Sequence, residues 1–387
     1  MKVVIIGGYG VFGSLTARLL ARDGHQLWLV GRHPEKGRAL AQDLNAQTLK
    51  LDVGAAPEAL FDQKPDVVID AAGPFQHYRD DPYAIPRLCI ANRCHYLDLS
   101  DSATFTQGIE ALNTDAKEAG VFVLSGASSV PGLSSCIVAD LIKGLEDVDA
   151  IDIAILPGNR APRGMSVIKS IVSGVGRPYQ LWRDGAWRTT LGWTDRKLYE
   201  LEPRMIRAGY SVNVPDIALL PALTYARTVT FRAGLELPVM NWALRLLSQL
   251  RQHARLELPE WAYFALYMIS QALYPFGSNR GGMEVSVSGK CNGRGVTRKW
   301  RLIAEEGHGP FVPGIMCRTI LRELPNIKTG ARPCLNEVPR PVVEHAMEDL
   351  QLRTGVFEHL DPRDTEETVG TINRTLRNQM CQSTAQR

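Results

Sequence analysis

The sequence lacks the features that mark several common classes of protein. It has no long run of lysine and arginine beside aromatic residues, and its net charge is only +3, so the electrostatic surface of a nucleic-acid-binding protein is missing. No CxxC pair occurs among the seven cysteines, and no histidine-flanked cluster has the spacing of metal ligands. We therefore expect no nucleic-acid partner, no metal site and cysteines that stay reduced.

Long apolar segments are scarce as well. The one segment that suggests a membrane, residues 261–276, is sixteen residues long, whereas a spanning helix needs about twenty. We expect it to be a buried helix, a subunit contact or a helix lying at a membrane interface, and we expect no transmembrane span. The chain also passes directly from Met1 and Lys2 into a strand-like run, without the pattern of a secretory signal, which predicts a cytoplasmic protein.

What the sequence does contain is typical of a globular protein. Hydrophobic residues make up 45% and charged residues 22% of the chain. A length of 387 residues exceeds that of one ordinary hydrophobic core and favours two domains.

Short β-branched apolar runs alternate with longer amphipathic segments in the first third of the chain. They predict strands at residues 3–6, 26–30, 47–51, 66–71, 96–99 and 121–125, and helices at residues 13–23, 36–44, 83–92 and 105–118. Strands that alternate with helices in this way form a parallel sheet with helices on both faces. The sequence therefore predicts an α/β protein whose residues 1–130 form a doubly wound Rossmann domain.

After Pro131 the pattern changes to that of a mixed α+β domain, predicted over residues 131–335 for substrate binding and dimerisation. Asp184-Gly185 and Asn292-Gly293 are turn dipeptides and are expected to join paired strands. The predicted strands are residues 152–156, 179–182, 187–190, 283–289 and 297–304, with two or three helices within 214–276. Residues 336–387 are expected to hold a helix at 339–352 that returns to the first domain, then a polar tail beyond Asp361.

A glycine-rich loop follows the first predicted strand. It satisfies G-x-G-x-x-G from Gly8 to Gly13 and directly precedes a predicted helix, the context that this dinucleotide-binding pattern requires. The glycines allow a tight turn and a close approach of the backbone to a pyrophosphate, which then lies at the N-terminus of the helix. The predicted cofactor contacts in the loop are Gly7, Gly8, Tyr9, Gly10, Val11 and Phe12.

The end of the second predicted strand indicates which dinucleotide binds. An NAD-binding protein places a carboxylate there, but this strand ends in Gly31, Arg32 and His33. The Arg32 guanidinium can form a bidentate pair with a 2′-phosphate, and His33 can add a donor. The sequence therefore favours NADP(H), with a solvent-exposed loop charge as the alternative interpretation of Arg32.

Residues 51–53, 71–78, 96–101 and 126–133 follow the third to sixth predicted strands. Together with the glycine loop, they resemble the saccharopine dehydrogenase (saccharopine reductase) family, specifically its bacterial relatives of unassigned substrate. The resemblance covers most of residues 1–165 and is weaker farther on, at residues 308–310 and 330–331.

This resemblance implies site residues. Adenine and the nicotinamide ribose would contact Asp52, Val53, Ala72, Gly73 and Pro74, whereas the substrate would approach Asp98, Leu99, Ser100 and Ser129. One position departs from the family, because Val130 replaces an acidic residue of the true saccharopine enzymes. This departure and the apolar middle region, residues 182–276, argue against saccharopine and favour a larger or more hydrophobic substrate.

The reaction requires a proton donor as well as a hydride. No Tyr-x-x-x-Lys pattern of the short-chain dehydrogenases follows the fourth predicted strand. The candidates at strand ends are His77, Tyr78, Asp98 and Asp101, each of which has a structural alternative as a loop or helix cap. Arg160 and Arg163 are candidates for binding a substrate carboxylate, or are ordinary surface arginines.

The resemblance implies an NADP(H)-dependent oxidoreductase that acts on a C–N bond of an amino-acid-type small molecule. The apolar middle region suggests an alternative, the reduction of a C=C or C=O bond of a lipid-like or polyketide-like substrate. A non-catalytic NADP(H)-binding regulator is a third possibility, because a nucleotide fold does not imply turnover. The family commonly pairs through its second domain, so we expect a homodimer, with residues 261–276 as a suitable contact.

Overall fold

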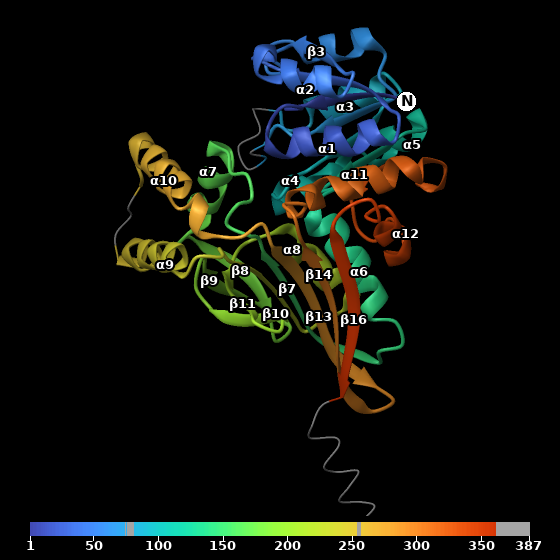
Figure 1. Ribbon diagram of the computed structural model, residues 1–387. Coiled ribbons are helices and arrows are strands. Elements are labelled where there is room, and N and C mark those ends of the chain that lie inside the picture. Colours follow the sequence, from blue (N-terminus) through green and yellow to red (C-terminus); the bar gives the residue numbers. More distant parts are fainter. Residues whose placement is uncertain (74, 76–80, 254–256, 361–387) are drawn as a thin grey trace, which may run out of the picture.

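The computed structural model describes residues 1–73, 75, 81–253 and 257–360. Two seven-stranded sheets organise the chain into two domains. In Figure 1 the first domain lies at the top and the second below it, with a smaller group of helices beside the second sheet.

The sheet of the first domain is parallel throughout, in the order β15-β6-β5-β4-β1-β2-β3. Its strands are β1 Lys2–Ile6, β2 Gln26–Gly31, β3 Gln47–Lys50, β4 Val67–Asp70, β5 His95–Asp98, β6 Phe122–Ser125 and β15 Gly330–Pro333. The central strands β1 and β4 are continuous runs of buried residues, as expected where helices cover both faces. The six predicted strands and the Rossmann topology are confirmed.

Helices cover both faces of this sheet. They are α1 Val11–Arg22, α2 Arg38–Asp43, α3 Ala84–Ala91, α4 Ala103–Gly108, α5 Asn113–Ala119 and α11 Val312–Arg322. Helix α12, Arg340–His345, packs on α11. The predicted helix at 105–118 is instead divided by a 3-10 turn at Ile109–Leu112. The 3-10 turn begins directly after Gly108, against which Tyr83 packs so closely that a Cβ would lie 2.2 Å from the Tyr83 hydroxyl.

The second sheet is mixed, in the order β10-β11-β12-β7-β13-β14-β16. Its strands are β7 Asp147–Leu156, β10 Lys197–Glu202, β11 Met205–Ser211, β12 Thr228–Ala233, β13 Gly281–Cys291, β14 Arg294–Ala304 and β16 Leu352–Leu360. A separate hairpin pairs β8 Pro178–Arg183 with β9 Ala186–Leu191. Both predicted turn dipeptides have positive φ and join paired strands, which confirms the two hairpins, whereas β10, β11 and β12 were not predicted.

Four helices lie between β7 and β13 along the chain, namely α7 Met165–Gly174, α8 Pro215–Thr224, α9 Pro238–His253 and α10 Glu260–Ala272. Three of them fall within 214–276, as predicted. Helices α7, α9 and α10 surround a separate hydrophobic cluster and stand to one side of the sheet in Figure 1. Among the described residues, no helix has both the length and the apolar character needed to cross a bilayer.

The chain crosses between the domains more often than the predicted boundaries allow. Helix α6, Ser134–Leu141, packs on β13 and β14 of the second domain. Helix α11 and strand β15 then return to the first domain, although residues 131–335 were predicted to belong to the second. Strand β16 crosses back to pair with β14, over residues that follow the helix predicted at 339–352 and for which the sequence predicted no strand. The tail predicted beyond Asp361 lies outside the described residues.

Helix α11 is tied to α1 by a buried charge cluster. Arg318, which is 2% exposed, donates to Asp23 at 2.8 Å from Nη2 to Oδ1, and Arg322 binds the same carboxylate at 2.7 Å. Burial alone would raise the pKa of Asp23, but the two guanidinium groups lower it to about 2. This ion cluster fixes the returning segment on the first domain.

Candidate functional site

Two adjoining cavities lie at the carboxyl ends of the parallel strands. The first, here the cofactor cavity, has a volume of about 410 Å³ and is lined by the glycine loop and by the ends of β2, β3 and β4. The second, here the apolar cavity, has a volume of about 430 Å³ and lies between the two domains. Phe12, Ala71, Ala72 and Val167 line both cavities, so the two meet at these residues.

The glycine loop has the geometry needed to hold a pyrophosphate. A Cβ on Gly8 would lie 2.8 Å from the Ile5 carbonyl oxygen, and one on Gly13 would lie 2.2 Å from that of Gly7. Only glycine therefore permits the close approach of β1 to α1. Helix α1 begins at Val11 with no acidic residue in its first turn, so its N-terminus is suited to an anion.

Three basic residues follow β2 along the wall of the cofactor cavity, namely Arg32, His33 and Lys36. The Tyr9 side chain covers this turn, because the backbone N–H of His33 donates to the Tyr9 hydroxyl at 2.8 Å. Gly31 leaves room for that ring, since a Cβ there would lie 2.2 Å from the Tyr9 hydroxyl. The Arg32 guanidinium and the Lys36 ammonium fit the 2′-phosphate of NADP(H), and His33 offers a further hydrogen-bonding group.

Lys36 and Val167 are among the lining residues of this cavity that the sequence-based prediction missed. Lys36 begins the region that the sequence predicted as a helix, and its position four residues after Arg32 was the available signal for a further phosphate contact. Val167 comes from α7 of the second domain, and no local pattern could have placed it here.

The remaining predicted cofactor residues that the structure describes lie in one or the other cavity. Asp52 and Val53 line it, and the Asp52 carboxylate accepts from the backbone N–H of Gly54 at 2.9 Å. Gly73 lines the apolar cavity next to Ala72. Pro74, His77 and Tyr78 lie outside the described residues.

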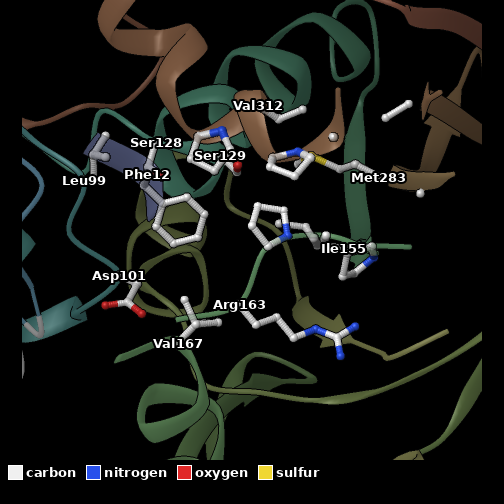
Figure 2. Close-up of a pocket in the computed structure, with 18 of the residues that line it drawn as sticks. Phe12, Leu99, Asp101, Ser128, Ser129, Ile155, Arg163, Val167, Met283 and Val312 are labelled. Atoms are coloured by element: carbon white, nitrogen blue, oxygen red, sulfur yellow. The ribbon is translucent and has the colours of Figure 1, made fainter. Parts of the chain in front are cut away.

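Nearly all of the described lining of the apolar cavity is uncharged (Figure 2). Its walls come from both domains and from α11, with Phe12, Phe75, Leu99, Ile155, Val167, Ile171, Leu235, Met283, Leu302 and Val312 among the larger apolar residues. Asp101 and Arg163 are the charged residues among those that line it, and Ser128, Ser129 and Ser170 add hydroxyl groups. In Figure 2, Asp101 and Arg163 lie on either side of Val167.

The predicted substrate and proton-transfer residues divide into two groups. Leu99, Ser129, Asp101 and Arg163 line the apolar cavity. Ser100 and Asp98, by contrast, are fully buried and line neither cavity. Arg160 also lines neither, and it donates to the carbonyl oxygen of Pro275 at 3.1 Å.

Asp98 supports the turn after β6. Its Oδ1 accepts from the backbone N–H groups of Ser100 at 2.9 Å and Gly126 at 2.8 Å, and from the Ser125 hydroxyl at 3.0 Å. Burial raises the pKa of Asp98 to about 7, against the lowering effect of these hydrogen bonds, and the charge of Asp70 raises it further. The buried carboxyl thus fixes the backbone from which Ser128 and Ser129 enter the apolar cavity.

Asp101 lies at the boundary of the domains. The Ser170 hydroxyl of α7 donates to its Oδ2 at 3.3 Å. This contact links the end of β5 to the helix that closes both cavities.

Comparison with known proteins identifies the first domain. The family model of the saccharopine dehydrogenase NADP-binding domain matches residues 3–124. The first domain is therefore similar to the NADP-binding domain of the saccharopine dehydrogenase family. Its cofactor is accordingly NADP(H), in agreement with the cations that follow β2.

The saccharopine dehydrogenase fold extends over the rest of the chain. A structure of saccharopine dehydrogenase (L-Glu forming) from Saccharomyces cerevisiae aligns with a TM-score of 0.65 at 14% identity, over 92% of this chain and 99% of that one. A probable dehydrogenase from Thermotoga maritima aligns with a TM-score of 0.43 at 11% identity, over 90% of this chain and 93% of that one. No curated protein sequence matches significantly. The alignment with the first of these structures shows that the chain has a saccharopine dehydrogenase-like oxidoreductase fold. The resemblance inferred from the motifs is confirmed.

Proposed function

We propose that this protein is an NADP(H)-dependent oxidoreductase that reduces a C=C or C=O bond of a predominantly apolar substrate. The observation that carries the proposal is the lining of the apolar cavity, which meets the cofactor cavity at Phe12, Ala71, Ala72 and Val167. A bound nicotinamide supplies the hydride. The surrounding apolar side chains would hold the acceptor and exclude water from it.

A panel of substrates tests this proposal. Purified protein and NADPH would be mixed with medium-chain enoyl thioesters, apolar ketones and imines, and the loss of NADPH absorbance would be followed. Amino acids would be mixed with NADP⁺ instead, and the gain of NADPH absorbance would be followed. Turnover of the enoyl thioesters or ketones is expected. Turnover confined to imines or amino acids would instead support the C–N chemistry of the second candidate.

That second candidate is the amino-acid-type substrate implied by the family resemblance. It is favoured by the two charged residues of the cavity, because Arg163 could bind a carboxylate and Asp101 an ammonium group. The third candidate, a non-catalytic NADP(H)-binding regulator, would be supported if NADPH bound tightly and every substrate in the panel failed.

Asp101 is the proposed carrier of the proton that completes the reduction. Its carboxylate lies in the apolar cavity, whereas Asp98 lines neither cavity. Asp101→Asn is expected to lower kcat by roughly 100-fold, the usual scale of general acid–base catalysis. Ser170→Ala removes the hydrogen bond between α7 and Asp101 but leaves the Asp101 carboxylate in place. The comparison of the two variants therefore distinguishes loss of the proton carrier from loss of the contact between the domains. Equal losses in the two variants would refute the role of Asp101 in proton transfer.

We also propose that two copies of the chain associate through the second domain. The outer surfaces of α9, α10 and the following turn form an apolar face of exposed side chains, namely Val239, Trp242, Leu246, Leu250, Trp261, Phe264, Met268, Ile269, Tyr274 and Phe276. Its five aromatic residues are 45–74% exposed, which amounts to roughly 600 Å² if an aromatic side chain offers about 200 Å². A standard interface buries about 800 Å² on each partner, so the whole face has the required size.

Two acidic residues, one just before α10 and one at its start, are already paired with basic residues. Glu257 is paired with Arg177, and Glu260 is paired with Lys169. Light scattering after size-exclusion chromatography should give a dimer for the wild type and a monomer for Trp242→Ser combined with Phe264→Ser. Trp187→Ser, at an exposed position of β9, is the control and should remain dimeric.

A monomeric wild type that sediments with phospholipid vesicles would overturn the dimer and indicate a membrane surface instead. The cytoplasmic location expected from the sequence stays a prediction.

A further inference from the structure

One wall of the apolar cavity is a row of large side chains on the second sheet. Met283 of β13 stands opposite Ile155 of β7 and opposite Leu302 of β14 in the strand register. Residues that stand opposite each other on neighbouring strands share one face of the sheet. All three residues line the apolar cavity, and together they are called the end row below.

The sheet is open on one side of the end row. Gly281 lies two residues before Met283, and Ala304 lies two residues after Leu302, so both belong to the same face as the end row. They stand opposite each other, and both line the apolar cavity. Their side chains amount to a single methyl group, which leaves room for a ligand over this part of the sheet.

The sheet is closed on the other side of the end row. Val285, two residues after Met283, stands opposite Ile153 and Trp300. These three residues are fully buried in the main hydrophobic core, and they line neither cavity. The apolar cavity therefore extends along the sheet over the two small residues and ends at the end row.

The end row is also the part of the cavity that lies away from the cofactor. Phe12 and Val167 line both cavities and lie toward the left of Figure 2, whereas Ile155 and Met283 lie toward the right. Met283 is 2% exposed, but Phe12 is 37% exposed. A substrate that reacts beside the cofactor would therefore extend its apolar part toward Met283.

We infer that Met283 limits the length of the alkyl chain that the substrate can carry. This inference rests on the proposed apolar substrate and adds a selection by chain length. Met283 occupies the middle of the end row, between Ile155 and Leu302, so its side chain covers the centre of the wall. Each methylene that reaches toward this wall gains apolar contacts, whereas one methylene too many must displace a side chain that is packed in the core.

The size of the cavity favours a chain of medium length. Its volume of about 430 Å³ lies in the lower part of the range of roughly 300–1,000 Å³ that is typical of ligand sites. A long chain would have to pass the end row, and behind that row the fully buried Val285 and Trp300 leave no opening that belongs to the cavity.

A series of probes that differ by one methylene tests the inference. Straight-chain alkan-2-ones from hexan-2-one to tetradecan-2-one would be titrated calorimetrically into the full chain saturated with NADP⁺, which cannot reduce them. The affinity of the wild type should rise by about fourfold with each added methylene and then stop rising at one chain length, the length limit.

Two substitutions should move the length limit in opposite directions. Met283→Ala removes about three methylene-sized atoms from the wall and should raise the limit by about three carbons. Ala304→Leu adds about three such atoms over the open part of the sheet and should lower the limit. Met316→Ala is the matched control, because Met316 is fully buried in the core but lines neither cavity, and its limit should equal that of the wild type.

Thermal melting checks that each variant is folded. If Met283→Ala is not folded, Ala304→Leu decides, and if neither is folded, the presence of a limit in the wild-type series decides.

An uninterrupted rise in wild-type affinity over the whole series, no ketone binding by the wild type, or one common limit for all folded variants would overturn the inference. These results do not depend on turnover. A length limit in binding without turnover of any substrate in the panel would refute the proposed reduction alone. Turnover of apolar substrates without any dependence on chain length would refute the role of Met283 alone.

Discussion

Replacement of the buried Asp98 by asparagine should change how the stability of the protein depends on pH. Asp98 is fully buried, its Oδ1 accepts three hydrogen bonds, and its Oδ2 has no partner in the described structure. Burial raises the pKa of the folded-state carboxyl to about 7, whereas an unfolded aspartate titrates near 3.9. Between these two values the folded protein binds a proton that the unfolded chain has lost.

The sign of the effect follows from this difference. Because the folded state binds more protons, the contribution of Asp98 to the free energy of unfolding is most favourable below pH 4 and decreases as the pH rises towards 7. The slope is about 1.4 kcal/mol per pH unit, so Asp98 should cost about 2 kcal/mol between pH 5 and pH 7. An asparagine side chain keeps the carbonyl acceptor but cannot ionise. The stability of Asp98→Asn should therefore lack the pH-dependent cost that Asp98 causes.

Urea unfolding monitored by tryptophan fluorescence at pH 5, 6 and 7 measures the effect. The stability of Asp98→Asn relative to wild type should rise by about 2 kcal/mol across this range. Asp216→Asn is a second test, because burial also raises the pKa of Asp216 to about 7. Asp184→Asn, in the exposed β8–β9 turn, is the control. Parallel pH profiles for wild type and Asp98→Asn would refute the reasoning.

Three other sets of substitutions test the cofactor site and the contact between segments. Arg32→Ala and Lys36→Ala should each weaken NADPH binding by about tenfold and leave NADH binding unchanged in fluorescence titrations, and equal losses for both nucleotides would contradict a 2′-phosphate contact. Gly13→Ala should abolish NADPH binding and destabilise the protein by about 1–3 kcal/mol, because the new Cβ would lie 2.2 Å from the Gly7 carbonyl oxygen; normal binding and melting would contradict this. Arg318→Met should lower the free energy of unfolding in urea by about 3 kcal/mol, because the carboxylates of Asp23 and Asp349 lose the buried guanidinium that pairs with them. An unchanged urea midpoint would show that the ion cluster adds no stability.

The cofactor half of the site was predictable because its information is local. The glycine loop, the basic end of β2 and the Asp52-Val53 turn each follow a strand, and the carboxyl ends of parallel strands meet at one edge of a sheet. The apolar cavity was not predictable in the same way. Ile155 belongs to β7, Met283 and Leu302 belong to the much later β13–β14 hairpin, and Val312 belongs to a helix that returns to the first domain.

Sequence position also failed to separate residues that look alike. Asp98 and Asp101 both lie at the end of β5, but one is buried beneath the turn after β6 and the other faces α7. Arg160 and Arg163 are three residues apart, and only Arg163 lines the cavity. Which residues of a turn are buried and which line a cavity depends on the segments that pack against the turn. Those segments come from distant parts of the chain.

The sequence by itself determined the Rossmann domain, the glycine loop and the preference for NADP(H), since each depends on residue type and spacing along a few neighbouring elements. The tertiary structure decided the return of α11 and β15 to the first domain, the crossing of β16 to the second, and the apolar character of the cavity between them. The physical reason is that local propensities act over about one helix or strand, whereas a cavity between domains is formed by side chains that meet only when distant segments pack together.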